Sequence, residues 1–474
     1  MIRKHKSLAA IALLALIAFM PTIALAQSPA SNAELQRQIA ILKAQVEQLQ
    51  RENQQLKSLG EQVEAIQQKL KTQETQARGQ AKSLPVVDAS SKGFVVSSPG
   101  GDYRMRVGGW IQADGRFYTT GTKPGAGTFI MRRVRPFLDG TVGRFFDFRV
   151  MTDFGQGTAL LQDAYGDVHY WPGLRLRGGK FKEPVGLERL QDDRYLMLVE
   201  RALTVNLVPD RDLGLQVHGA LFDERVEYRL GLFNGVPDNT AADIDNNDAK
   251  DFAGRLFFHP FAGTPYEFAQ KLGFGVSGTY GSERGTPLDV YRSAGQTMFF
   301  SFNKGVNASG DRFRVSPQAN YYYGPLGMQA EFVDNVQQVR LVTPSSAGTR
   351  PHTLSNQAWQ IAGTYLLTGE DAQYGAPVTP YRNFNPLAGG WGAWELAARV
   401  DQLTVDREAF EFGEADPNTS SREAFEYAVG ANWYLNENVK LMADYARTSF
   451  VWGAAKGHNR TVESTILSEF QVQF

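Results

Sequence analysis

The chain has 474 residues, and its 49 Lys and Arg balance 50 Asp and Glu, so bulk charge gives no support to a nucleic-acid partner. Cysteine is absent, which excludes disulfides, thiolate metal sites and cysteine nucleophiles. The slightly negative mean hydropathy argues against a bundle of membrane helices. It is compatible with a membrane β-barrel, in which only alternate residues face lipid.

Residues 1–26 have the three parts of a secretion signal. The start is positively charged, residues 8–20 are apolar, and Ala24-Leu25-Ala26 forms a small-residue cleavage site. The alternative is a membrane anchor helix, but the apolar run is shorter than the ~20 residues that span a bilayer. We therefore expect residues 1–26 to be a signal peptide and the mature chain to be exported.

Residues 27–75 are rich in Gln, Glu, Lys and Leu and predict a coiled coil. Apolar residues recur every seven positions at Leu35, Leu42, Leu49, Leu56, Val63 and Leu70, and a second set includes Ile39 and Val46. This spacing specifies left-handed supercoiling with partner helices, and Asn53 at a core position would fix the register. The alternative is one amphipathic helix lying on another surface. Residues 76–102 then read as a linker.

From residue 103 onward the pattern changes to a period of two. In residues 103–117 the odd positions are apolar or small and the even positions carry all the charge. Such alternation, in a run too long for an ordinary soluble strand, indicates a tilted strand that crosses an outer membrane. Similar segments recur to the end of the chain. We expect an all-β fold for residues 103–474, a closed antiparallel transmembrane β-barrel of about 16 strands, rather than a soluble β-sandwich.

The last strand carries the strongest local signal. Phe470, Val472 and Phe474 alternate with two glutamines at the C-terminus. This tail resembles the terminal strand of bacterial outer-membrane proteins, and that resemblance implies recognition by the barrel-assembly machinery through the strand ending at Phe474.

A set of short motifs resembles the phosphate-selective porin O/P family. These motifs are Gly108-Gly109-Trp110-Ile111-Gln112-Ala113-Asp114, Met131-Arg132-Arg133, Asp139-Gly140-Thr141, Gly179-Lys180-Phe181, Gly186-Leu187-Glu188-Arg189, Glu200-Arg201, Tyr365-Leu366-Leu367-Thr368-Gly369-Glu370, Gly392-Ala393-Trp394-Glu395 and Asn432-Trp433-Tyr434. The resemblance implies a homotrimer of sixteen-stranded barrels in the outer membrane of a Gram-negative cell. It also implies an arginine ladder that leads to a central constriction.

The resemblance also suggests site residues. Arg132 and Arg133 look like the family's paired pore arginines, Arg189 like the basic residue of its constriction loop, and Arg201 like the arginine after that loop's glutamate. Trp110 stands where the family has an arginine. With the charged face of the first strand, the predicted pore-lining, anion-binding residues are Arg104, Arg106, Arg116, Arg132, Arg133, Arg189 and Arg201. The predicted neighbours of the constriction are Trp110, Asp163, Asp167 and Glu188.

Two connections bear on the pore. Residues Pro184 to Asp212 are long for a connection between strands, so we expect them to fold into the lumen rather than form a solvated extracellular loop. The segment from Ser282 to Phe302 holds only two arginines and includes apolar Met298-Phe299-Phe300, so it contributes little to an arginine ladder.

The expected function is therefore a porin, a water-filled channel for passive diffusion of small hydrophilic solutes that prefers anions such as phosphate, other oxyanions or carboxylates. The alternative is a barrel that mainly anchors a coiled-coil structural or adhesive element. Six scattered histidines and no Gly-x-Ser-x-Gly elbow argue against an enzyme. An acidic cluster at 243–248 lacks the glycine and glutamate of an EF-hand, and no cofactor or metal is expected. The expected partners are small anionic solutes, outer-membrane lipid and two further copies of the chain, with the coiled coil in the periplasm.

Overall fold

The computed structural model describes residues 29–81, 84–120, 125–171, 173–241, 247–342 and 350–474, so the predicted signal peptide lies outside the described residues. The helices are α1 (Pro29–Ala81), α2 (Leu187–Leu190) and α3 (Glu408–Glu411). The strands are β1 (Val86–Ser90), β2 (Gly93–Ser97), β3 (Arg104–Tyr118), β4 (Thr128–Val142), β5 (Phe146–Asp153), β6 (Leu160–Trp171), β7 (Leu174–Lys182), β8 (Arg211–Leu221), β9 (Val226–Phe233), β10 (Asp251–Phe258), β11 (Gly273–Pro287), β12 (Tyr291–Arg292), β13 (Met298–Phe300), β14 (Val306–Tyr323), β15 (Leu326–Leu341), β16 (His352–Leu366), β17 (Ala393–Thr404), β18 (Ser421–Asn436), β19 (Val439–Ala454), β20 (His458–Asn459) and β21 (Glu463–Gln473).

Helix α1 belongs to the first of two compact units, residues 1–83 and 84–474. Its composition favours a helix, because strong helix formers dominate and Gly60 is the only glycine before residue 79. The heptad residues predicted to form a seam, such as Leu42 and Leu56, leave more than half of their surface exposed in the single chain. Among the described helices, none is both long enough and apolar enough to cross a membrane.

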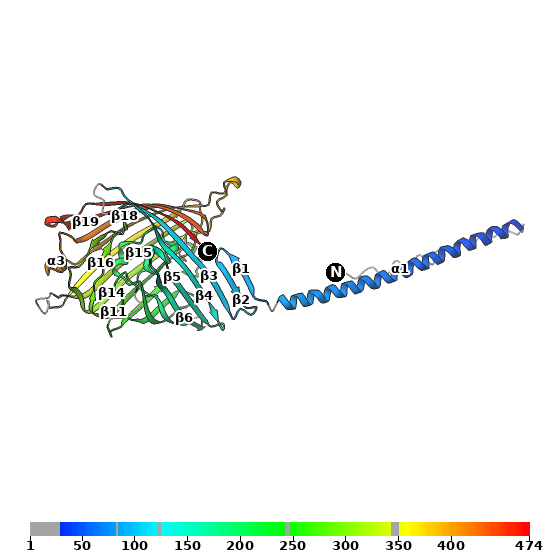
Figure 1. Ribbon diagram of the computed structural model, residues 1–474, viewed down its shortest axis with the longest axis horizontal. Coiled ribbons are helices and arrows are strands. Elements are labelled where there is room, and N and C mark those ends of the chain that lie inside the picture. Colours follow the sequence, from blue (N-terminus) through cyan, green and yellow to red (C-terminus); the bar gives the residue numbers. More distant parts are fainter. Residues whose placement is uncertain (1–28, 82–83, 121–124, 172, 242–246, 343–349) are drawn as a thin grey trace. The chain divides into compact units, whose positions relative to one another are not determined.

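Sixteen strands of the second unit form a closed antiparallel barrel, which confirms the predicted fold (Figure 1). Each barrel strand pairs with its neighbour along the chain, from β3 through β11 and then β14 to β19 and β21. The barrel closes where β21 pairs with β3, and Phe474 and Gly109 exchange two backbone hydrogen bonds of 3.0 Å. Closure leaves no unpaired edge to face lipid.

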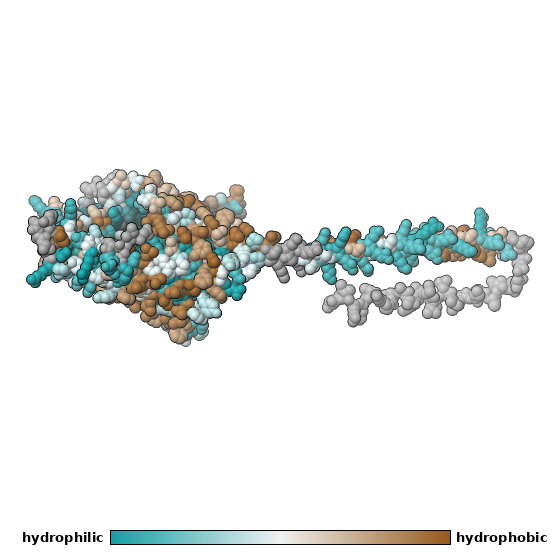
Figure 2. Space-filling model, turned by 60° about the horizontal axis from the view of Figure 1, so that its bottom comes forward, coloured by the Kyte–Doolittle hydropathy of each residue, from teal (hydrophilic) through white to brown (hydrophobic). Residues whose placement is uncertain are grey.

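The two faces of the wall differ as the alternation predicts. On β3, Met105, Val107 and Ile111 point outward and stay exposed, whereas Gln112 and Asp114 point inward and are buried. Figure 2 shows hydrophobic side chains covering much of the barrel wall. At one end Trp394 stacks on Trp433, with ring centroids 5.0 Å apart. Aromatic residues near the end of a membrane barrel are typical of the girdle at the membrane–water interface.

The structure replaces most of the predicted linker at 76–102 with regular structure. Helix α1 continues to Ala81, and β1 pairs with β2 as a hairpin. Strand β2 then pairs with residues 104–107 of β3, just beyond the stretch of β3 that β21 covers. The sequence did not predict that β2 would pair with β3, because this pairing depends on the part of β3 that extends beyond β21.

The two ends of the barrel differ in the length of their connections. The short-turn end has the tight turns at 143–145, 222–225, 324–325 and 437–438, and the chain also ends there. The long-loop end carries the segments 183–210, 288–305 and 405–420. One long segment, 367–392, lies at the short-turn end.

Two segments from the long-loop end fold into the lumen, which confirms the prediction for Pro184 to Asp212. Leu203, Leu207 and Val208 from the first segment join Phe299 and Phe300 from the second in one buried apolar cluster. The cluster also includes residues of β15 to β19, so it fills the lumen on that side of the barrel. The chambers described below are lined mainly by β3 to β11 and by these infolded segments.

Candidate functional site

The infolded segment 183–210, called here the constriction loop, is held by carboxylates that accept its backbone N–H groups. Glu331 on β15 accepts from Leu187 N at 2.6 Å, and Asp444 on β19 accepts from Val199 N at 2.6 Å. Both distances are short for N–H···O hydrogen bonds. Carboxylates of β15 and β19 therefore hold the backbone of the loop, in addition to the contacts that its side chains make.

A glycine starts the inward turn. Gly186 precedes α2 with φ +80°, a conformation that side-chain-bearing residues rarely adopt. An added Cβ would lie 3.1 Å from the Cβ of Arg189 and 3.3 Å from Oε1 of Glu331. Both the backbone angle and the close packing explain a glycine here.

Charged side chains of the loop meet arginines of the opposite wall. Glu200 accepts from Arg132 Nε at 2.8 Å and lies 3.3 Å from Arg116. Asp193 lies 3.5 Å from Arg133 Nε and also pairs with Arg135 and Arg201. These contacts join the loop to β3 and β4.

The guanidinium groups hold the loop's carboxylates in the charged form. Burial alone would raise the pKa of Asp193, but Arg133, Arg135 and Arg201 lower that pKa well below its usual range. Burial likewise opposes ionisation of Glu200, yet Arg132 and its neighbours lower the pKa of Glu200 to about 2. Both groups therefore count as negative charges at neutral pH.

A β-bulge explains how two consecutive arginines both face inward. Gln112 pairs with Arg133, whereas the next residue, Ala113, pairs with Met131, so Arg132 is the extra residue. In a regular strand successive side chains point to opposite faces, and a bulge breaks that rule. Arg132 reaches Glu200 while Arg133 donates to Gln112 Oε1 at 2.9 Å.

Three chambers follow one another along the basic wall. The outer chamber, nearest the long-loop end, has a volume of about 220 Å³. Its charged lining consists of Arg132, Arg133, Arg135, Arg189, Arg201, Arg211 and Arg292, with Asp193, Glu200 and Asp210. Seven arginines against three carboxylates give this chamber an excess of positive charge.

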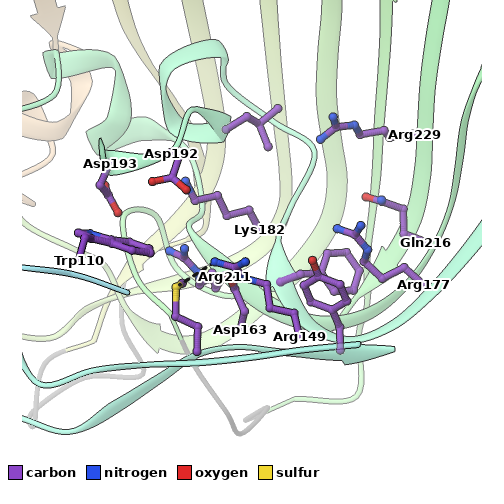
Figure 3. A pocket seen from close by; sticks show the side chains of 14 residues that line it. Trp110, Arg149, Asp163, Arg177, Lys182, Asp192, Asp193, Arg211, Gln216 and Arg229 are labelled. Atoms are coloured by element: carbon purple, nitrogen blue, oxygen red, sulfur yellow. Dashed lines mark hydrogen bonds and ion pairs between the residues drawn. The ribbon is translucent and has the colours of Figure 1, made fainter. Parts of the chain in front are cut away.

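The middle chamber, also about 220 Å³, lies on the other side of Asp193 and Arg211, which line both chambers (Figure 3). Its charged lining is Arg149, Arg177, Lys182, Arg211 and Arg229, with Asp163, Asp192 and Asp193. Trp110 lines it too, with only 2% of its surface exposed and the Arg194 guanidinium 4.7 Å from its ring centre. Trp110, predicted as a neighbour of the constriction, thus places an aromatic ring in the middle chamber.

The inner chamber is the largest, at about 330 Å³, and extends toward the short-turn end. It shares Arg229 and Leu190 with the middle chamber. Neighbouring chambers are therefore separated by a few shared side chains, Asp193 and Arg211 at one border and Leu190 and Arg229 at the other.

Most of the predicted pore residues meet around the outer chamber. Arg132, Arg133, Arg189 and Arg201 line it, and Arg116 reaches its carboxylate Glu200. Arg104 and Arg106 do not join them: Arg104 is exposed at the short-turn end of β3, and Arg106 pairs with Asp139.

The predicted neighbours of the constriction have structural partners. Asp163 pairs with Arg211 at 2.8 Å and lines the middle chamber. Asp167 binds Arg177 at 2.7 Å, and Glu188 accepts from Ala202 N at 2.8 Å within the loop. Residues 242–246 of the acidic cluster lie outside the described residues.

The residues predicted from the sequence did not include several basic side chains that line the chambers. These are Arg135, Arg149, Arg177, Lys182, Arg211, Arg229, Arg255 and Arg292. Alternation alone could have identified those in mid-strand, such as Arg149 and Arg229, because they lie on the polar face of their strands. Lys182 and Arg211 end and begin strands beside the loop, where no pattern points to them.

Comparison with known proteins identifies the family of the chain. The model of the family described as phosphate-selective porin O and P matches residues 105–450. Porin O of Pseudomonas aeruginosa is 25% identical over 395 residues, covering 76% of this chain and 86% of that protein.

One solved structure shares the architecture, and others are similar to a lower degree. The outer membrane channel DcaP of Acinetobacter baumannii superposes with a TM-score of 0.51 at 9% identity, covering 78% of this chain and 97% of that one. OmpT of Vibrio cholerae gives 0.49 at 10% identity, covering 79% and 98%. The chain belongs to the phosphate-selective porin O and P family and is an outer-membrane porin, a channel protein rather than an enzyme.

Proposed function

We propose that the channel prefers anions and lets phosphate, other oxyanions or small carboxylates diffuse across the outer membrane. The observation that carries this proposal is the lining of the outer chamber, where seven arginines face three carboxylates. Guanidinium groups present forked donors that match the oxygens of phosphate and carboxylate groups.

The arrangement in series favours passage over trapping. The arginines of the constriction already bind Asp193 or Glu200, so an entering anion competes with protein carboxylates for each donor. Several weak sites in a row let an ion enter and leave. The positive excess recurs in the middle chamber, where five cations face three carboxylates.

The proposal is tested by the reversal potential of the purified protein in a planar bilayer under a KCl gradient, followed by titration of phosphate against the chloride current. We expect a chloride-favouring potential. Phosphate block at low concentration would support phosphate as a solute, and anion preference without block would support a general anion porin. A cation-favouring potential would overturn the proposal, and no conductance would favour the anchor alternative.

We further propose how the chain is assembled. Bacterial barrels have short periplasmic turns, so the short-turn end faces the periplasm, and β3 begins there. Residues 27–75 then form a periplasmic coiled coil that joins a homotrimer, after removal of residues 1–26. The exposed heptad residues of α1 support this proposal. The strand ending at Phe474 serves as the signal for the barrel-assembly machinery.

A further inference from the structure

The inner chamber exposes more apolar surface than either of the other two, although the middle chamber also contains aromatic rings such as Trp110 and Phe181. Its apolar and aromatic lining consists of Leu190, Phe257, Tyr322, Ala372 and Tyr374. Its charged or ionisable lining consists of Arg229, Arg255, Lys271, His259 and a single carboxylate, Glu227. By contrast, the outer chamber has only Ala202 and Val205 as apolar lining.

Arg229 presents free donors to this chamber. Within the described part of the chain, no carboxylate, carbonyl or other acceptor forms a hydrogen bond or ion pair with Arg229. Its neighbours across β8 and β10 are His218 and Arg255, so the row of side chains around it is basic. An anion that enters the chamber therefore meets a guanidinium for which it need not displace a protein carboxylate.

The groups beside Arg229 are held in place. The guanidinium of Arg255 lies 4.3 Å from the centre of the Phe257 ring and donates from Nε to Gln318 at 3.1 Å. Tyr374 donates its hydroxyl hydrogen to the Leu187 carbonyl of the constriction loop at 2.6 Å. The aromatic rings and the cations thus form two fixed surfaces of one chamber.

Tyr322 gives an independent sign of a missing polar partner. Only 5% of its surface is exposed, yet among the described residues its hydroxyl has no hydrogen-bond partner. Buried polar groups without a partner are uncommon and call for an explanation such as a bound group. Here the residue lines a chamber that is large enough to hold a small organic molecule.

We propose that the inner chamber binds organic anions that combine a carboxylate with an apolar ring, such as aromatic carboxylates. The carboxylate binds Arg229, beside Arg255, which pairs with Glu227 at 3.7 Å. The ring packs against Phe257, Tyr322 and Tyr374. This proposal rests on the proposed anion channel and names a solute class for it. An inorganic oxyanion gains nothing from the apolar wall, so it finds its best partners in the outer chamber.

The experiment compares benzoate and acetate, two monocarboxylates of equal charge, as blockers of the chloride current of the full-length channel in a planar bilayer. Each is added from the periplasmic side, where the inner chamber opens before the constriction. Because burying a phenyl ring against apolar walls favours binding, we expect benzoate to block at roughly tenfold lower concentration than acetate.

Two variants locate the effect. Arg229→Gln should raise the blocking concentration of benzoate severalfold, and it breaks no ion pair within the described residues. Arg292→Gln removes the same charge from the outer chamber and should leave benzoate block unchanged. Retention of the folded barrel is checked by its heat-dependent mobility in detergent gels.

The outcomes separate this proposal from the anion preference. An anion-selective channel that benzoate and acetate block equally would overturn the inner site and leave the porin proposal standing, whether or not the variants fold. A cation-selective channel that benzoate still blocks through Arg229 would support the site and overturn the anion preference. Equal loss of block in both variants would also count against the inner chamber.

Discussion

Glu200 shows how single residues set the charge of the pathway. It lies on the constriction loop and pairs with Arg132 and Arg116, so it neutralises part of the positive excess in the outer chamber. Because its ion pairs lower its pKa to about 2, it carries a negative charge at neutral pH. The pore charge at this point is therefore fixed by sequence rather than by pH.

The change Glu200→Gln should make the channel more selective for chloride. Removing one negative charge within ~5 Å of the path lowers the energy of chloride and raises that of potassium by about 0.5–1 kcal/mol each in water, so the chloride-to-potassium permeability ratio should rise about fivefold to thirtyfold. Reversal potentials in a KCl gradient measure this ratio. An unchanged ratio would mean that Glu200 lies outside the conducting path.

The same pair of proteins gives a pH prediction. The folded pKa of Glu200 is depressed from the usual ~4.3, so its ion pairs stabilise the fold above that pH and lose this contribution as pH falls toward 2. The difference in permeability ratio between Glu200→Gln and the unchanged protein should persist from pH 7 to pH 4. A difference that disappears near pH 5 would contradict the assigned pairing.

At this scale the sequence predicts orientation better than contact. Alternation places Arg116 in the lumen, and it would also place Arg229 there. It does not show that Arg132 and Arg133 both face inward, because that needs a bulge opposite Gln112 and Ala113. Nor does it show which cations are already paired, since the partners come from a loop far along the chain.

Among the elements, the constriction loop depends on hydrogen-bond acceptors supplied by strands β15 and β17. Glu331 accepts from Leu187 N at 2.6 Å and from Gln360 at 3.0 Å, and Asp401 accepts from Leu203 N at 3.2 Å. Losing a charged acceptor leaves a buried N–H unsatisfied, which costs about 1–3 kcal/mol. A few strong hydrogen bonds thus hold the loop in its position.

Glu331→Ala should loosen the constriction loop. We expect larger single-channel conductance and more current noise, because the N–H of Leu187 loses its acceptor. Glu331→Gln is the matched control, since its amide oxygen can still accept from Leu187, and it should keep the quiet current. Equal noise in the two variants would show that charge, not the hydrogen bond, seats the loop.

The sequence predicted the strands and the infolding of the constriction loop from period and length. It did not predict that residues 367–392 also line the lumen at the other end, where Tyr374 contacts Leu187. That segment has no charge pattern or repeat to mark it, and its position depends on packing against residues such as Leu198 and Tyr322.

At the scale of the whole molecule, the two units differ in whether a single chain can bury the groups that each unit must bury. The barrel buries its backbone polar groups by closing on itself through β21 and β3. Helix α1 has no such solution within one chain, because its heptad leucines remain exposed and a lone helix in water gains little from packing. Association of several copies through α1 would satisfy the helix.

Two deletions separate the roles proposed for the ends of the chain. Removing residues 31–71 should lower the temperature at which the trimer dissociates in detergent gels, while the amount in the outer membrane stays the same. Removing Phe474 should instead lower the amount that reaches the outer membrane. A trimer of unchanged heat stability without α1 would show that the barrels associate through their own walls.

The way the constriction loop is held has a consequence for redesign. The carboxylates of β15, β17 and β19 grip main-chain N–H groups, which every residue except proline possesses. The side chains that the loop turns toward the basic wall add ion pairs to this anchoring but do not supply its backbone contacts. Side chains that recognise other solutes can therefore be introduced on this loop one residue at a time, while the barrel strands continue to hold its backbone.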